Sequence, residues 1–293
     1  MNVLENLNAA MNYIEENLDG EIDVRQLAQI ACCSEYHFRR MFSFLSNMSL
    51  GEYIRNRRLS IAASMLKKTD IKIIDIAIQF GYESADAFTK AFQAMHGATP
   101  TQLRKSGIPI KSFLPITFQL SIRGGYKMDY RIIEKEAFSL VGVSGKIPLI
   151  YNGGNPHTAE VWKKLRQEDL LVLMEHSEIE PKGILNVYSN YEDKAAEGTS
   201  LDYFVGIAVG KPLSERLMER FDVLPIEKST WAVFTSCGEF PKAAQETWAR
   251  IGDTWFPSSE YEMTGGPEIS WYESYDFGKP DFKTEIWLPV KKI

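Results

Sequence analysis

A carboxylate and an indole lie two positions apart near the C-terminal end of the chain, in residues 282–290, FKTEIWLPV. Apolar residues alternate along this stretch, which predicts a β-strand whose successive side chains point to opposite faces. Glu285 and Trp287 then share one face with Lys283, and the other face meets the core. On a poorly hydrated face an organic cation stabilises a carboxylate by pairing with its charge, and an aromatic ring attracts the same cation. This pair therefore predicts a site for a small cationic ligand.

The strand that carries this pair is part of an internal duplication. Residues 133–145, IEKEAFSLVGVSG, align without a gap with residues 226–238, IEKSTWAVFTSCG, at an offset of 93. Each copy continues into an amphipathic helix that contains tryptophan, AEVWKKLRQ or QETWARIGDTW, and then into two strands. Each copy thus has the order strand, helix, strand, strand. This repeated order predicts an α+β domain with pseudo-twofold symmetry. We expect the two halves to pair edge to edge into one curved antiparallel sheet with the helices on one face.

The last strands of the two copies, LDYFVGIAV and FKTEIWLPV, suggest what the second face holds. In this alignment Phe204 stands where the second copy has Glu285, and Gly206 stands where it has Trp287. We expect Phe204 and Trp287 to form the walls of a groove, Gly206 to leave room, and Glu285 to be the counter-ion of a ligand. Four tyrosines are candidates either for the wall or for the core: Tyr188, Tyr191, Tyr272 and Tyr275.

Basic residues concentrate in a second region that could bind a polyanion. Residues 36–68 carry seven basic residues and one acidic residue, although residues 1–107 as a whole hold 12 of each. Residues 127–293 hold 19 basic and 27 acidic residues, a net charge of -8. A basic stripe in an otherwise acidic chain indicates a polyanionic partner for that stripe alone, and the alternative is a solvated helix face. The acidic half, in contrast, attracts cations.

The basic stripe overlaps a second internal repeat. The segments VRQLAQIACCSEYHFRRMF and IIDIAIQFGYESADAFTKAF each predict a short helix, a tight turn and a second helix that begins after a serine N-cap, Ser34 or Ser84. Between them, SLGEYIRNRRLSIAASMLKKT predicts a helix of roughly 30 Å. Neighbouring segments of the DNA major groove lie about 34 Å apart. A rigid helix of this length could hold two recognition helices in adjacent groove segments.

The stretches YIRNRRLSIAASML and DIAIQFGYESADAFTKAFQAMHGATPTQLR resemble the DNA-binding domain of the AraC/XylS family of transcription regulators, over residues 8–106. The resemblance implies that the double helix-turn-helix binds double-stranded promoter DNA. The residues expected at the DNA are Tyr36, Arg39, Arg40, Arg55, Arg58, Thr89 and Lys90. Whether Arg39 and Arg40 read guanine or hold phosphates stays open. Ala85 and Asp86 stand where many family members have polar amides. We therefore expect the second motif to position the protein on DNA more than to read the base sequence.

The stretches TWFPSSEYEMTGGPEISWYES and TEIWLPV resemble the GyrI-like effector-binding domain, over roughly residues 126–292. That resemblance implies a multidrug-binding groove for small, often lipophilic and cationic molecules, with Glu285 as the counter-charge. A different class remains open: some GyrI-like proteins resemble hydrolases in which a groove glutamate and a tyrosine act on reactive small molecules. No Ser-His-Asp, Cys-His or metal-ligand spacing accompanies Glu285 in the sequence. A groove for a peptide is a third possibility.

We therefore expect a multi-domain chain: an all-α double helix-turn-helix domain over residues 1–107, a linker over 108–125 and the α+β effector domain over 126–293. The function that fits is a ligand-responsive transcription regulator and not an enzyme, with promoter DNA, a small cationic or aromatic effector and RNA polymerase as partners. No cofactor, metal or membrane is expected. Three cysteines without a disulfide framework and an acidic, amphipathic N-terminus predict a cytoplasmic protein. Coupling between effector and DNA would pass through the linker.

Overall fold

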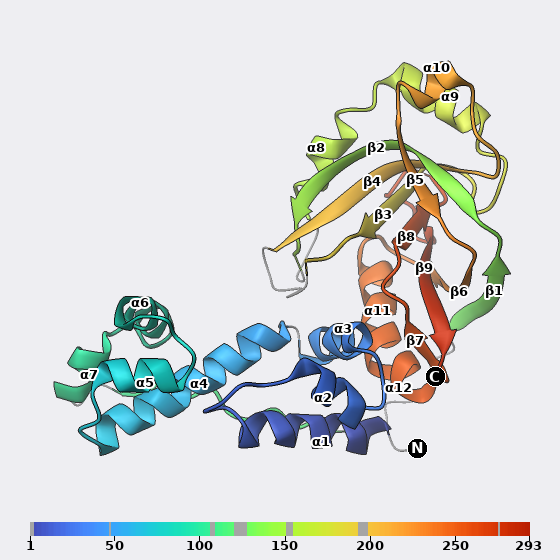
Figure 1. Ribbon diagram of the computed structural model, residues 1–293. Coiled ribbons are helices and arrows are strands. Elements are labelled where there is room, and N and C mark those ends of the chain that lie inside the picture. Colours follow the sequence, from blue (N-terminus) through green and yellow to red (C-terminus); the bar gives the residue numbers. More distant parts are fainter. Residues whose placement is uncertain are drawn as a thin grey trace. The chain divides into compact units, whose positions relative to one another are not determined.

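The computed structural model describes residues 3–46, 48–105, 109–119, 128–150, 155–192, 199–274 and 276–293. The chain forms two compact units, one of Met1–Phe38 with Met48–Ser121 and one of Arg39–Asn47 with Ile122–Ile293. Figure 1 labels the helices and strands of both. Within the described ranges, every helix is too short or too polar to cross a bilayer.

The first unit is helical, as its periodicity predicts. The helices from the N-terminus onward are α1 (Val3–Glu16), α2 (Val24–Ile30), α3 (Glu35–Ser46), α4 (Leu50–Lys68), α5 (Ile73–Gln79), α6 (Ala85–His96) and α7 (Pro100–Lys105). From Arg39 onward, α3 belongs to the second unit. The predicted serine N-caps are confirmed: the hydroxyl of Ser34 accepts from the amide of His37 at 3.3 Å, and that of Ser84 accepts from Ala87 at 3.1 Å. These bonds satisfy amides that the first turn leaves without a partner.

Two helix-turn-helix motifs flank the long helix α4, namely α2 with α3 and α5 with α6. Their turns have the same backbone shape, because Cys32 in the first and Gly81 in the second both adopt positive φ, 56° and 79°. One side of α4 packs its apolar stripe against α5, α6 and α7. Phe88 and Phe92 of α6 are completely buried in that core, which leaves the other face of α6 toward solvent.

The second unit is an antiparallel sheet with helices on one face. Its strands are β1 (Asp129–Lys135), β2 (Phe138–Pro148), β3 (Leu185–Ser189), β4 (Ser200–Val209), β5 (Asp222–Ile226), β6 (Ser229–Cys237), β7 (Tyr261–Met263), β8 (Glu268–Tyr272) and β9 (Lys283–Lys292). Its helical segments are α8 (Thr158–Trp162), α9 (Gln167–Glu175), α10 (Glu215–Met218), α11 (Lys242–Arg250), the π-helix η1 (Ile251–Trp255) and α12 (Phe256–Ser258). The strand order is β1-β6-β9-β8-β3-β4-β2-β5, and β7 pairs with β9.

The predicted edge-to-edge pairing of the two copies is confirmed, since β3 of the first copy pairs with β8 of the second. Residues 133–145, which we expected to form one strand, instead contain the end of β1 and most of β2. The two copies exchange their first strands: β1 pairs with β6, and β5 pairs with β2. Each copy therefore contributes its first strand to the outer edge of the other copy, and β1 and β5 are the two edge strands of the sheet.

The helices cover one face of the sheet, as expected. Residues of α8 and α9 pack with Tyr203, Val205 and Ile207 of β4, and Figure 1 shows these helices along the outer side of β2 and β4. On the same face, Phe234 of β6 meets the ring of Trp255 in η1 at 4.9 Å. The opposite face of the sheet carries the residues singled out in the last strand.

Candidate functional site

A row of side chains crosses the sheet on the face opposite to α8 and α9. The register pairs Phe204 with Val187, Val187 with Ile269, Ile269 with Trp287, Trp287 with Val233, and Val233 with Arg131. Residues paired directly in antiparallel strands share a face, and Glu285 joins them because it precedes Trp287 by two positions on β9. All members of the row except Arg131 and Glu285 are buried in one apolar cluster. The row therefore ends, at the edge strand β1, in a single positive charge.

Glu285 binds that charge. The guanidinium of Arg131 donates to both carboxylate oxygens, at 2.9 Å to Oε1 and 3.0 Å to Oε2. The indole Nε1 of Trp287 donates to Oε2 at 2.9 Å. The guanidinium carbon of Arg131 lies 5.5 Å from the ring centroid of Trp287, within cation–π range. The hydrogen bond to Glu285 raises the pKa of Arg131, so this site stabilises a planar, delocalised cation.

Tyr188, Tyr191 and Tyr272 do not line this face, and Tyr191 packs against the cluster on the helix-covered face. Tyr272 pairs with Thr284, whose side chain points away from Glu285, and burial raises the pKa of Tyr272. Tyr188 pairs with Tyr203 on the helix-covered face, with ring centroids 5.0 Å apart. Tyr275 lies outside the described residues. Of the candidate wall residues, Phe204 and Trp287 share the face of Glu285, whereas Tyr188 and Tyr272 belong to the opposite face.

The interpretation of Gly206 changes as well. A Cβ atom at this position would lie 2.2 Å from the carbonyl oxygen of Val141 and 2.8 Å from the ring of Phe204. Glycine is therefore required by the close approach of β4 to β2, and the ring of Phe204 covers the position. The space that we expected to be left for a ligand is filled by the protein itself.

The register also corrects the alignment of the last strands. Glu285 pairs with Thr235, and Gly206 pairs with Gly142; residues 235 and 142 are counterparts at the offset of 93. The counterpart of Glu285 is therefore Gly206 and not Phe204, so the alignment was wrong by two residues. A shift by two keeps every side chain on the same face, which is why the alternation of apolar residues did not reveal it.

Arg131 is the site residue that sequence reasoning missed. Its counterpart in the other copy is Leu224, which pairs with Leu140 as Arg131 pairs with Val233. Glu285 and Arg131 thus replace a glycine and a leucine of the apolar half of the domain. A comparison of the copies that extended four residues upstream would have shown this second charge.

The residues expected at DNA divide into two groups. Arg55 and Lys90 are exposed, and Tyr36, Arg39 and Thr89 are partly exposed. Arg40 and Arg58 instead donate hydrogen bonds to acceptors within the protein. The solvent-facing side chains on α3, α4 and α6 that could meet a nucleic acid are therefore fewer than the sequence suggests.

Arg40 and Arg58 are used within the protein. Arg40 is 5% exposed, and its guanidinium donates to both carboxylate oxygens of Glu268, at 2.7 and 2.8 Å, within the second unit. Arg58 donates to the carbonyl oxygens of Leu18 and Gly20, at 2.9 and 2.5 Å, and burial lowers its pKa. In this structure neither guanidinium is free for the DNA contact expected of it, because intramolecular acceptors far away in sequence bind it.

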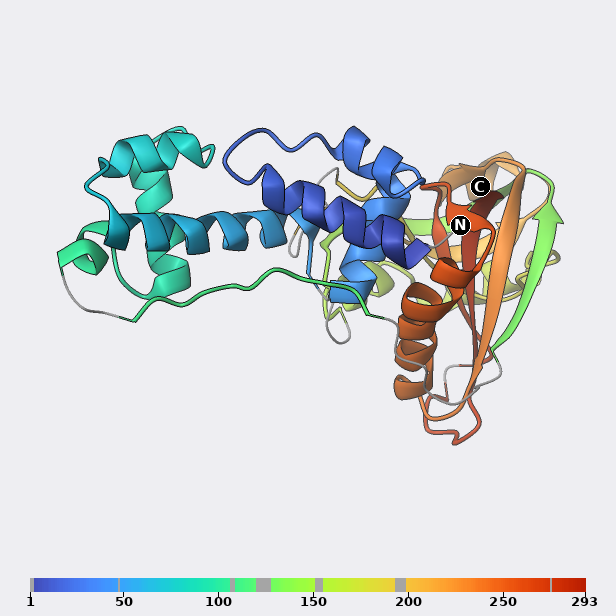
Figure 2. The ribbon, with the colours of Figure 1, turned by 90° about the horizontal axis from the view of Figure 1, so that it is seen from below.

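The described part of the expected linker, residues 109–119, lies along α1 and α4 in the first unit (Figure 2). Residues 106–108 and 120–127 are outside the described ranges. Three of its amides donate to side chains of these helices: Phe113 to Ser60 at 2.8 Å, Ile116 to Tyr53 at 3.1 Å and Phe118 to Asn8 at 2.8 Å. This part of the linker is therefore an ordered strap on the DNA-binding unit.

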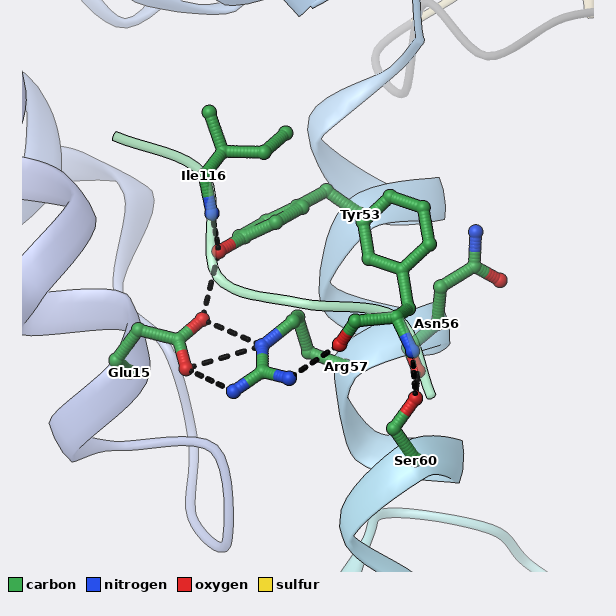
Figure 3. Close-up of polar contacts among 7 residues, drawn as sticks. Glu15, Tyr53, Asn56, Arg57, Ser60 and Ile116 are labelled. Atoms are coloured by element: carbon green, nitrogen blue, oxygen red, sulfur yellow. Dashed lines mark hydrogen bonds and ion pairs between the residues drawn. The ribbon is translucent and has the colours of Figure 1, made fainter. Parts of the chain in front are cut away.

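A buried ion pair holds the middle of this strap (Figure 3). Arg57 of α4 donates to both carboxylate oxygens of Glu15, including 2.5 Å to Oε2, and to the carbonyl oxygen of Phe113. The hydroxyl of Tyr53 donates to Glu15 at 2.7 Å. Burial alone raises the pKa of Glu15, but the hydrogen bonds from Arg57 and Tyr53 outweigh it and hold the pKa below 4.5. Helices α1 and α4 and the strap thus share one charged network.

We expect Arg39→Ala to weaken DNA binding by about tenfold, since an arginine contact to DNA contributes roughly 1–3 kcal/mol. The measurement is a gel shift on a duplex that the wild-type chain has selected from a random pool. Base reading would make the loss larger on that duplex than on a shuffled one, whereas phosphate contact would lower the salt dependence equally on both. The control is Lys163→Ala, which removes the same charge from an exposed residue that directly follows α8. Unchanged affinity in Arg39→Ala would remove Arg39 from the interface.

Two family models match separate stretches of the chain. A GyrI-like small molecule binding domain matches residues 128–291, more than half of the chain. A helix-turn-helix domain matches residues 27–106. The first match contains the whole sheet with Arg131 and Glu285, and the second contains α4 and most of both helix-turn-helix motifs.

The relatives align over the helical part. The uncharacterized HTH-type transcriptional regulator YbfP of Bacillus subtilis (strain 168) is 39% identical over 94 residues, which cover 32% of each chain. The HTH-type transcriptional activator AarP of Providencia stuartii is 37% identical over 94 residues, 32% of this chain and 70% of AarP. Regulatory protein SoxS of Escherichia coli (strain K12) is 35% identical over 92 residues, 31% of this chain and 86% of SoxS. The chain thus spans about a third of YbfP but most of the two shorter relatives.

A solved structure, SAV2435 bound to tetraphenylphosphonium, is similar to part of the chain. The similarity has 23% sequence identity and a TM-score of 0.45, and it covers 56% of this chain and 94% of that protein.

Proposed function

This chain belongs to the AraC/XylS-type regulators that carry a GyrI-like small molecule binding domain, and on that premise we propose that it is a ligand-responsive transcription regulator whose effector is a small organic cation. The double helix-turn-helix binds promoter DNA, and the Glu285 face of the sheet binds the effector. The effector alters transcription to the extent that its affinity differs between two states of the protein.

One observation carries the choice of a cation: Glu285 and Trp287 together bind a guanidinium in the structure. A carboxylate that is 18% exposed, with an indole ring beside it, favours a positive partner over water. The apolar row from Trp287 to Phe204 is buried next to this charge, which keeps the surroundings of the carboxylate apolar. The excess of acidic residues in this half of the chain attracts cations from solution.

The hydrolase alternative is not favoured. It needs a tyrosine hydroxyl next to Glu285, and the register places Tyr188 and Tyr272 on the other face of the sheet. The donors at the Glu285 carboxylate are Arg131 and Trp287. Neither a guanidinium nor an indole serves as a general acid at neutral pH. A sensor that releases its ligand unchanged fits these partners better.

Two further parts of the proposal concern the cellular setting. We propose that the regulator works in the cytoplasm, which suits three cysteines that form no disulfide. We also propose that the DNA-bound protein contacts RNA polymerase. The relative AarP is a transcriptional activator, and activation by contact with polymerase is the simplest mechanism for a protein of this type.

The test is an isothermal titration of the full chain with two ligands of nearly equal shape, methyltriphenylphosphonium and neutral triphenylphosphine oxide. We expect the cation to bind at least tenfold more tightly, a difference of about 1.4 kcal/mol. Equal affinities, or a preference for the neutral compound, would contradict a cationic effector. The pair separates the effect of charge from that of the three phenyl rings.

A further inference from the structure

The cation site of the second unit is already occupied by a side chain of the protein. Arg131 uses both oxygens of the Glu285 carboxylate. The same guanidinium lies over the ring of Trp287. The carboxylate and the aromatic ring are the two groups that a ligand cation would need, so ligand and Arg131 cannot have them at the same time.

The fold does not require this ion pair. In the other copy of the repeat, Leu224 and Gly206 take the places of Arg131 and Glu285 at equivalent positions of the register. The same strand geometry forms there without any charge. Two charges that both depart from the repeat, and that bind each other, point to a role other than holding the sheet together.

Arg131 is also the partner that can leave. Its side chain is 42% exposed, whereas that of Glu285 is 18% exposed and Trp287 is 1% exposed. An ion pair with one well-hydrated member is weak, because water compensates much of the lost attraction. Arg131 extends from the edge strand β1, and its guanidinium lies over the ring of Trp287. A nearby carboxylate, Glu180, also attracts Arg131 and raises its pKa.

We infer that Arg131 is an intramolecular competitor that determines which cations the site accepts. Its guanidinium occupies the effector position in this structure, and a cation binds only when it gains more from Glu285 and the ring of Trp287 than Arg131 does. Small hydrated cations gain too little and are excluded, whereas lipophilic organic cations displace the arginine. This inference rests on the proposed function, because it assumes that the effector is a cation held by Glu285.

The test compares three variants of the full chain by isothermal titration with methyltriphenylphosphonium. Arg131→Ala removes the competitor and is expected to bind about tenfold more tightly than wild type, whereas Arg131→Lys keeps a competing charge and is expected to stay within about threefold. Lys283→Ala removes one exposed positive charge from the same face of β9 and controls for the general change in charge. Thermal unfolding of each variant verifies that it is folded.

A free guanidinium compound sharpens the comparison. In Arg131→Ala, millimolar methylguanidinium is expected to refill the vacated position and to weaken phosphonium binding again, toward the wild-type value. The same addition to wild type is expected to change little, because Arg131 already fills the position. Methylguanidinium that fails to compete in Arg131→Ala would contradict the inference.

The remaining outcomes separate this inference from the proposed function. If wild type binds the phosphonium through Glu285 and Arg131→Ala binds no more tightly than Lys283→Ala, the competitor role is wrong and the proposed function stands. If neither wild type nor Arg131→Ala binds the phosphonium in preference to triphenylphosphine oxide, the cationic effector is wrong and the inference is overturned with it.

Discussion

Replacement of Glu285 with glutamine is expected to weaken the binding of methyltriphenylphosphonium by roughly 30-fold, which corresponds to about 2 kcal/mol. Glutamine keeps the size of the side chain and can still accept from Trp287 Nε1, as the carboxylate does now. It removes the negative charge and replaces one acceptor oxygen with an NH2 group. Because Glu285 is largely shielded from water, solvent compensates little for that loss. Isothermal titration of the full-length variant measures the change directly.

The matched control for this substitution lies on the neighbouring edge strand. Glu134 is exposed, and its side chain points to the opposite face of β1 from Arg131. Glu134→Gln changes the net charge of the unit by the same amount, so its effect on affinity is expected to stay within about twofold. If the two variants lose equal affinity, the cation responds to overall charge and Glu285 is not its counter-ion.

Replacement of Glu15 with glutamine is expected to destabilise the first unit by about 2 kcal/mol. Loss of one member of a fully buried ion pair costs roughly 3–5 kcal/mol, since the other charge is left without a partner. The value is lower here because Glu15 and Arg57 have side-chain exposures of 21% and 11%. Arg57 then has a neutral amide oxygen in place of the carboxylate, together with the carbonyl oxygen of Phe113. Urea unfolding, followed by helical circular dichroism, measures the loss.

The strap gives this substitution a second measurable effect. The hydroxyl of Tyr53 donates to Glu15 and accepts from the amide of Ile116. Loss of the carboxylate leaves this hydroxyl less firmly held, which weakens its hydrogen bond with the Ile116 amide. Hydrogen exchange over residues 113–118 is expected to become faster in Glu15→Gln. Glu16→Gln, at the exposed neighbouring position, is the control. Exchange that stays as slow as in wild type would show that the strap does not depend on the Glu15–Arg57 pair.

The same pair predicts a dependence on pH. The folded-state pKa of Glu15 is lower than its ordinary value of 4.5. A carboxylate with a depressed pKa contributes stability that is present above the ordinary value and is lost as the pH falls through the folded-state value. The stability difference between wild type and Glu15→Gln should therefore be constant above about pH 5 and shrink below pH 4.5.

The sequence was sufficient to predict which face of each strand in the sheet meets the helices. Alternation assigned Glu285, Trp287 and Phe204 to one face, and the register agrees. Alternation has a period of two, however, so it could not exclude an alignment of the copies that was shifted by two residues. The counterpart of Glu285 was misassigned to Phe204 for this reason. It also could not show that residues 133–145 contain two strands that pair with different partners.

Contacts between distant parts of the sequence account for the other differences. Arg131 and Glu285 are 154 residues apart, and their pairing depends on the exchange of β1 into the second copy. Arg58 was expected at DNA because its segment is basic and its helix is amphipathic. Its acceptors are backbone carbonyls of a turn, which no side-chain pattern marks. Hydrophobic periodicity predicts whether a side chain is buried or exposed, but it does not predict which group a charged side chain binds.

In the proposed function, the negative charge of Glu285 recognises the positive charge of the effector. The most direct measurement is a cycle of four isothermal titrations, in which wild type and Glu285→Gln each bind methyltriphenylphosphonium and triphenylphosphine oxide. The cycle isolates the energy between the two charges from every contact made by the phenyl rings. We predict a coupling of about 2 kcal/mol, with the preference for the cation nearly absent in Glu285→Gln. A coupling of zero, with the same preference in both proteins, would contradict the account.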